Sequence, residues 1–118
     1  MTEINQDFVL YQGDTKILRV EVFDTEGNPK NIAGASILWG MYVFTQPQIV
    51  LTKSTSGGIT ITDAINGIFE VQIDSADSLD LEPDFYGHEA EVTDIAGNVS
   101  TIFTGTVEVR CSRIGVGA

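Results

Sequence analysis

The chain has 118 residues, enough for one domain that buries roughly two thirds of the surface its unfolded form exposes. Its 17 acidic and 6 basic residues give a net charge of −11, which repels phosphate backbones and anionic lipid and argues against nucleic acid or membrane as partners. No apolar run reaches the roughly 18 residues that span a bilayer, and "MTEINQDF" lacks signal-peptide features. We therefore expect a single soluble domain over residues 1–118, made and kept inside a cell.

Period-two alternation of apolar and polar residues runs along most of the chain and predicts β-strands. The predicted strands, in chain order, are "DFVLY" 7–11, "TKILRVEVF" 15–23, "SILWGMYVF" 36–44, "QIVLT" 48–52, "GITIT" 58–62, "GIFEVQI" 67–73, "YGHEAEV" 86–92 and "VSTIFTGTVEV" 99–109. Turn-forming sequences such as "DTEGNP", "AINGI" and "DIAGN" separate them. The one helical candidate is a single turn in "SADSLDLEP", with Ser75 as its cap and Pro83 beyond its end. This spacing favours an all-β, antiparallel, immunoglobulin-like sandwich of about eight strands.

The alternation also predicts which side chains point into the core. On each strand the side chains of one face are apolar and are expected to point into the core. Charged neighbours such as Arg19, Glu70 and Glu89 belong to the opposite face, which is expected to contact solvent. The predicted inward residues of the four clearest strands are Leu18, Val20, Val22, Phe69, Val71, Ile73, Tyr86, His88, Ala90, Val92, Val99, Phe103, Val107 and Val109.

The strand "SILWGMYVF" departs from this rule because both of its alternating faces are apolar. Trp39 belongs to the face expected in the core, so a second apolar set remains to be covered. An exposed apolar patch of several hundred Å² marks an interface. The predicted interface residues over 36–52 are Leu38, Tyr42, Phe44, Ile49 and Leu51. The alternative is that the connection "VFTQPQI" and the segment "FVLY" fold over this face within the monomer.

We find no catalytic, cofactor-binding or metal-binding constellation in the sequence, and an enzyme is not expected. His88 is the only histidine, and its inward phase indicates a structural side chain. Glu89 and Glu91 resemble the carboxylate pair of a glycosidase, but an exposed sheet face carries such acids as a solvated patch. The aspartates that begin three turns could bind calcium, yet their spacing fits turn formation better; they are Asp24, Asp63 and Asp94.

Residues 79–92, "LDLEPDFYGHEAEV", resemble the corner of immunoglobulin-like domains. In that corner a tyrosine enters a long strand and its hydroxyl bonds back to the preceding backbone. Tyr86 corresponds to this residue, and His88 stands where antibody domains carry a cysteine. Trp39 corresponds to the core tryptophan. The disulfide is missing, since Cys111 is the only cysteine.

Over roughly residues 8–110 the chain resembles the small immunoglobulin-like domains of tailed bacteriophages and prophages, and is similar to the N-terminal domain of phage baseplate upper proteins. The features that carry the resemblance are Gly13-Asp14 before the second strand, "DTEGNPKNIAGASI" before the tryptophan strand, "ITDAINGIFEV", and the strand beginning at Tyr86 with its "DIAGN" hairpin. The resemblance implies a non-enzymatic virion protein that is assembled in the bacterial cytoplasm. Its partners would be other virion proteins of the capsid, connector or tail, or copies of itself in a homo-oligomer.

The chain ends at Ala118 without the further module of a baseplate upper protein, so we expect a head-decoration, head-tail junction or small tail accessory protein. Residues 111–118 are expected to form a flexible tail or to pair with a neighbouring chain. The competing interpretation is a calcium- or carbohydrate-binding adhesion module at the host-contacting end of the virion. Its sugar-stacking aromatics would be Tyr11, Tyr42 and Phe85.

Overall fold

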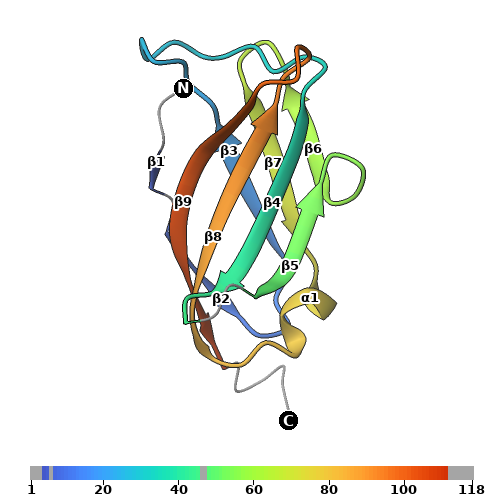
Figure 1. Cartoon of the computed structure of the whole chain (residues 1–118). Coiled ribbons are helices and arrows are strands. Elements are labelled where there is room, and N and C mark those ends of the chain that lie inside the picture. Colours follow the sequence, from blue (N-terminus) through green and yellow to red (C-terminus); the bar gives the residue numbers. More distant parts are fainter. Residues whose placement is uncertain (1–3, 6, 46–47, 112–118) are drawn as a thin grey trace.

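A computed structural model describes residues 4–5, 7–45 and 48–111, which form two β-sheets packed face to face (Figure 1). The chain is an all-β, immunoglobulin-like sandwich, as predicted. The elements are β1 (Ile4–Asn5), β2 (Phe8–Tyr11), β3 (Lys16–Glu21), β4 (Ser36–Val43), β5 (Ile49–Ser54), β6 (Ile59–Asp63), β7 (Ile68–Ile73), α1 (Ser75–Leu79), β8 (Asp84–Thr93) and β9 (Val99–Arg110).

The large sheet has the strand order β1-β9-β8-β4-β5, and β2 also pairs with β9. The small sheet has the order β3-β7-β6 and lies behind the large one in Figure 1. Two features differ from the predicted antiparallel sandwich: the two-residue strand β1 is additional, and both β1 and β2 run parallel to β9. The N-terminal segment therefore lies along the last strand, and β4 and β5 form the opposite end of the sheet.

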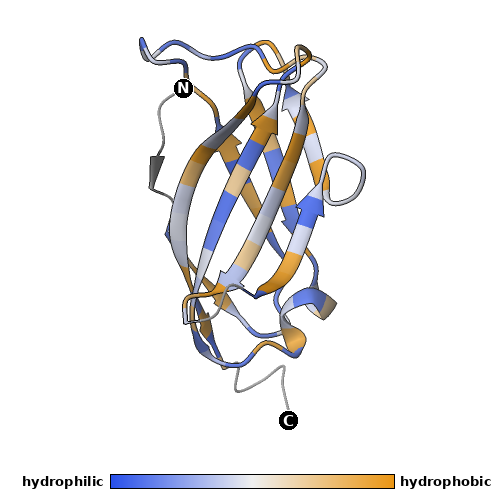
Figure 2. Ribbon diagram, viewed as in Figure 1, coloured by the Kyte–Doolittle hydropathy of each residue, from blue (hydrophilic) through white to orange (hydrophobic). Residues whose placement is uncertain are grey.

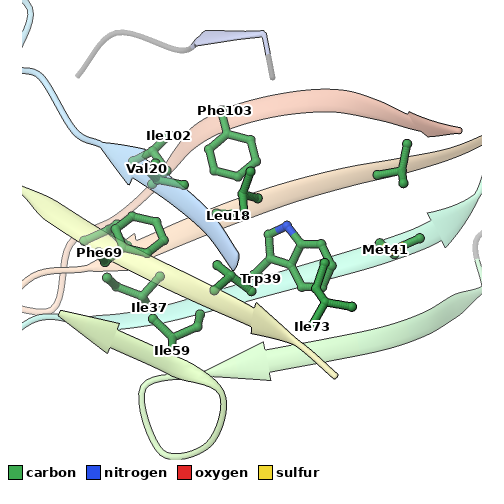
Figure 3. Close-up of a cluster of buried hydrophobic side chains, with 14 of the residues drawn as sticks. Leu18, Val20, Ile37, Trp39, Met41, Ile59, Phe69, Ile73, Ile102 and Phe103 are labelled. Atoms are coloured by element: carbon green, nitrogen blue, oxygen red, sulfur yellow. The ribbon is translucent and has the colours of Figure 1, made fainter. Parts of the chain in front are cut away.

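The core lies between the two sheets and takes side chains from both of them (Figure 3). Trp39 and Met41 of β4 are fully buried, as are Phe69 and Ile73 of β7. With one exception, the predicted inward side chains are buried. Their neighbours along the strands are half-buried or exposed, as the period-two pattern requires, except for Gly87 and Ile102, which are buried. The inner faces are therefore the part of this fold that the alternation specifies best.

The exception is Val99, which was predicted to point inward and is 60% exposed. On the partner strand Ala90 pairs with Phe103 and Glu91 pairs with Thr101, so Ile102 is an extra residue in β9. Such a β-bulge reverses the alternation on one side of it, which explains why Ile102 and Phe103 are both buried.

The single helical turn forms where it was predicted, but its cap differs. Asp74 is the N-cap residue of α1 instead of Ser75, and the carboxylate of Asp77 accepts a hydrogen bond of 2.7 Å from the N–H of Asp74. This acidic first turn suits the positive end of a helix. The helix ends at Leu79, before Pro83, as expected.

The predicted tyrosine corner is confirmed. The hydroxyl of Tyr86 donates a hydrogen bond of 2.8 Å to the carbonyl oxygen of Glu82. Burial, followed by the charges of Asp84 and Glu82, raises the pKa of Tyr86 above its ordinary value, so the hydroxyl stays protonated and able to donate. The corner fixes the entry of β8 into the large sheet.

Two sequence predictions concern residues that the structure does not describe. The middle of the connection between β4 and β5, residues 46–47, and the C-terminal tail from residue 112 onward lie outside the described residues. No helix within the described ranges is long and apolar enough to cross a membrane.

Candidate interaction surface

The outer face of the large sheet is apolar where β4 and β5 lie side by side. Leu38 is 49% exposed there, and Phe44 and Ile49 are each 55% exposed. The small sheet packs against the opposite face of β4, where Trp39 lies. Figure 2 shows the hydrophobic end of β5 beside β4 in the front sheet. The described chain therefore leaves the second face of "SILWGMYVF" open to solvent.

A hollow of about 240 Å³ lies in this apolar face, and we call it the β4–β5 groove. Gly40 forms part of its lining, and a Cβ atom added to Gly40 would make only ordinary contacts, at 3.8 Å from the carbonyl oxygen of Leu51 and 3.9 Å from Ile49 and Thr52. The groove exists partly because this strand position carries no side chain. The lining residues are Leu38, Gly40, Tyr42, Ile49, Thr52, Glu89 and Glu91.

The ring of Tyr42 forms one end of the groove and lies over Gly87 of β8. A Cβ atom at Gly87 would collide with that ring, so glycine is needed for Tyr42 to lie flat on the sheet. Phe44 contacts Tyr42 edge-on, with ring centroids 5.9 Å apart. The result is a pair of aromatic rings held against the outer face beside the groove.

Two carboxylates line the groove on its β8 side. Glu89 pairs with Gly40 across the β4–β8 ladder, and Glu91 pairs with Leu38, so both acids project from the outer face next to the apolar residues. Both are half-buried. Within the described ranges, neither carboxylate forms an ion pair. The groove is thus apolar within and acidic along one wall.

The edge strand β5 is protected against pairing with another strand. Lys53 points to the inner side, opposite Trp39 in the ladder, and its ammonium lies 2.7 Å from the carboxylate of Asp77 in α1. Burial would raise the pKa of Asp77, but the hydrogen bonds from Lys53 and the N–H of Asp74, with the Lys53 charge, lower it overall. An inward-pointing lysine and a bulge at Val50, which has no partner in β4, are features that discourage edge pairing. The outer face, and not the edge, is therefore the available surface.

Of the five predicted interface residues, the structure brings four to this face: Leu38, Tyr42, Phe44 and Ile49. Leu51 is a correction. It pairs with Met41 and packs against the core, because a register shift between β4 and β5 places Ile49 opposite Tyr42. Whether the four outer residues contact a partner stays a prediction.

The described residues do not show the alternative, in which other segments of the same chain fold over the outer face of β4. The segment "FVLY" forms β2 on the far side of β9, where Leu10 enters the core. Phe44 and Thr45, which begin the connection from β4, are exposed.

A second region of the same outer face lies over β2, β8 and β9. Phe85 is exposed between hollows of about 400 and 270 Å³. Arg110 forms an ion pair with Glu108 and donates a hydrogen bond of 3.4 Å to the hydroxyl of Tyr11. The hydrogen bond from Arg110 lowers the pKa of Glu108 below its usual range, so this pair stays charged over a wide pH range.

His88 is a structural residue, as predicted. It is fully buried, and its Nδ1 accepts a hydrogen bond of 3.0 Å from the indole N–H of Trp39. An imidazole whose Nδ1 accepts is in the neutral tautomer that carries its proton on Nε2. The rings of Phe8 and Phe103 flank it with centroids 5.0 and 5.1 Å away. Sequence phase indicated the burial of His88 but gave no sign of its bond to Trp39.

The turn aspartates also act as predicted. The Oδ1 atom of Asp94 accepts from the N–H groups of Ala96 and Asn98, at 3.0 and 2.9 Å. The backbone bond from Asn98 lowers the pKa of Asp94, to which the charge of Lys30 adds a smaller effect. Asp24 makes the equivalent pair of bonds in its own turn. Among the described residues no group of three or more His, Cys, Asp or Glu side chains is placed to hold a metal ion.

No protein-family model and no curated protein matches this sequence. Solved structures that are similar to it include CopC from Methylosinus trichosporium OB3b, with 16% identity over 91% of this chain and 87% of that one and a TM-score of 0.47. A mutant of the SrpA adhesin from Streptococcus sanguinis matches at 16% identity over 89% of this chain and 55% of that one, with a TM-score of 0.47. Murine CRIg matches at 10% identity over 91% and 92%, with a TM-score of 0.45. These likenesses are too distant to bear on function.

Proposed function

We propose that this domain is a non-enzymatic packing module of a phage virion, and that it attaches to another virion protein or to copies of itself through the β4–β5 groove. The observation that carries the proposal is the apolar outer face of β4 and β5, which the described chain leaves exposed. Exposed apolar area of this kind beside a hollow is typical of protein interfaces.

The aromatic pair supports the same function. The ring of Tyr42 lies over Gly87 and contacts the ring of Phe44, so little side-chain entropy is lost at Tyr42 when a partner covers it. Rigid aromatic residues at the centre of an interface commonly carry much of its binding energy. An interface of standard size, about 1,600 Å² in total, would hold subunits together without any chemistry.

The phage assignment rests on the ordered sequence features described above, from Gly13-Asp14 to the "DIAGN" hairpin. It is tested by inducing a culture that encodes the protein and separating phage particles on a density gradient. Mass spectrometry of the particle band should detect the chain at a fixed ratio to the major capsid protein. Recovery of the chain only outside the particle band would contradict the assignment.

A second candidate is a carbohydrate-binding module, favoured by one observation. Tyr11, Tyr42 and Phe85 all lie on the outer face of the large sheet. The charged pair of Arg110 and Glu108 lies on β9, between β2, which carries Tyr11, and β8, which carries Phe85. Aromatic rings beside charged hydrogen-bonding groups are a common arrangement for sugar binding. Binding on a glycan array that is lost in both Phe85→Ala and Tyr11→Ala, neither of which lines the β4–β5 groove, would favour this candidate over the packing module.

A further inference from the structure

We propose that the β4–β5 groove accepts an aliphatic side chain flanked by lysine or arginine from a different protein, and not a second copy of this chain. This inference rests on the proposed packing function and specifies its partner. The apolar part of the partner follows from the lining by Leu38, Tyr42 and Ile49. The basic part follows from the wall formed by Glu89 and Glu91.

The carboxylates of Glu89 and Glu91 favour a cation from outside the chain. Both are half-buried beside apolar groups, and within the described residues no ion pair neutralises either one. A half-buried acid is less screened by water than a fully exposed one, so an incoming ammonium or guanidinium gains more there. Because the two acids are two residues apart on one strand, both face the same side of the groove.

The basic residues that the structure describes, 16 to 110, make a second copy of this chain a poor source of that cation. Arg19 is paired with Glu21, Arg110 with Glu108, and Lys53 with Asp77. Lys16 lies over the ring of Phe8, and the charge of Lys30 acts on Asp94. None of these five described cations lines the groove.

Symmetry adds a second reason against self-association. In a two-fold dimer the same patch is buried on both chains, so two acidic walls, one from each groove, would be enclosed in a single interface. Each chain would also bring a net charge of −11. Like charges facing each other across an interface are unfavourable, whereas a basic partner is both attracted and oriented.

The test is a titration of the isotope-labelled protein with the acetylated and amidated peptide Lys-Ser-Leu-Ser-Lys, followed by amide chemical shifts. In an extended peptide the leucine and both lysines project from one face, matching the groove and its acidic wall. We expect saturable shifts at Gly40, Thr52 and Glu89. The peptides Glu-Ser-Leu-Ser-Glu and Lys-Ser-Ser-Ser-Lys, which lack the charge or the aliphatic group, should each bind about tenfold more weakly.

Matched variants separate the groove from general attraction to an acidic protein. Gly40→Leu fills the hollow without changing charge and should weaken binding about tenfold, as should the double variant Glu89→Gln, Glu91→Gln. The control Glu26→Gln, Glu70→Gln removes the same charge from the β3–β4 connection and the small sheet and should leave affinity within about twofold. Thermal melts confirm that each variant is folded.

The outcomes distinguish this inference from the proposed function. Equal loss of affinity in both double variants, or shifts spread over the small sheet, would overturn the inference by showing attraction to net charge alone. Dimerisation that Gly40→Leu abolishes would also overturn it, yet would leave the packing function standing. Absence of the chain from phage particles would refute the proposed function even if the peptide binds.

Discussion

The outer faces of the two sheets differ, although strands of both alternate with the same period. On the small sheet, Arg19 and Glu21 form an ion pair beside Glu70, and Ile17 is the one large aliphatic residue that is exposed within the described strands β3, β6 and β7. On the large sheet, apolar residues of β4 and β5 surround a hollow. A polar outer face needs only water, whereas an exposed apolar one lowers solubility, and this difference is the basis of our proposal that another molecule covers the large sheet.

The inner faces of the two sheets share one core, so truncating a buried side chain on either sheet should cause a similar loss of stability. This is the largest effect that we expect. Phe69→Ala on the small sheet and Met41→Ala on the large sheet should each lower the free energy of unfolding by about 2–5 kcal/mol, because both side chains are fully buried in one core. Urea denaturation measures the loss. A loss below about 1 kcal/mol for either variant would show that the sheets do not share a core.

The next effect concerns the bond between Trp39 and His88, both on inner faces of the large sheet. His88→Phe leaves the indole N–H buried without its acceptor and should lower the free energy of unfolding by about 1–3 kcal/mol. Adding Trp39→Phe removes the orphaned donor, so the second substitution should cost less in the His88→Phe background than in the wild type. A double-mutant cycle on urea curves measures this coupling; additive losses would contradict the bond.

A smaller effect concerns the edge of the large sheet, through the pair of Lys53 and Asp77. The pKa of Asp77 is lowered in the folded state, so its stabilisation is present above the ordinary aspartate pKa and is lost as the pH falls through the lowered value. Lys53→Met should therefore lower the free energy of unfolding by about 1 kcal/mol at neutral pH. As the pH is lowered progressively below the ordinary aspartate pKa, the difference in unfolding free energy from the wild type should shrink, and a difference that stays constant at every pH would contradict this role of the pair.

The smallest effect on stability gives the sharpest comparison of the outer faces. Leu38→Ser and Ile17→Ser replace exposed aliphatic residues, 49% and 57% exposed, on the large and small sheets respectively. Each should change the free energy of unfolding by less than about 0.5 kcal/mol. Only Leu38→Ser should weaken binding of the Lys-Ser-Leu-Ser-Lys peptide. Equal effects on binding would remove the distinction between the two faces.

Much of this fold follows from local sequence patterns. Alternation placed Trp39, Phe69 and Val71 in the core, and the sequence before Tyr86 predicted the corner that its hydroxyl closes. The predicted direction of a side chain was wrong where it depends on the register between paired strands. The bulge at Ile102 turned Val99 outward.

The candidate surface was only partly predictable, for a related reason. Two-sided hydrophobicity identified β4, but the register shift that turns Leu51 toward the core depends on how two strands pair. The groove itself depends on the absence of a side chain at Gly40 and on the ring of Tyr42 over Gly87, which come from strands far apart in the sequence. Such contacts have no local signature in one sequence.

The most direct measurement is the solution mass by light scattering across a concentration series, for the wild type and for Gly40→Leu. An acidic groove that awaits a basic partner predicts a monomer of 12.7 kDa at every concentration in both proteins. An oligomer of the wild type that persists on dilution and is absent in Gly40→Leu would show that copies of the chain cover the groove themselves, which contradicts a partner of opposite charge.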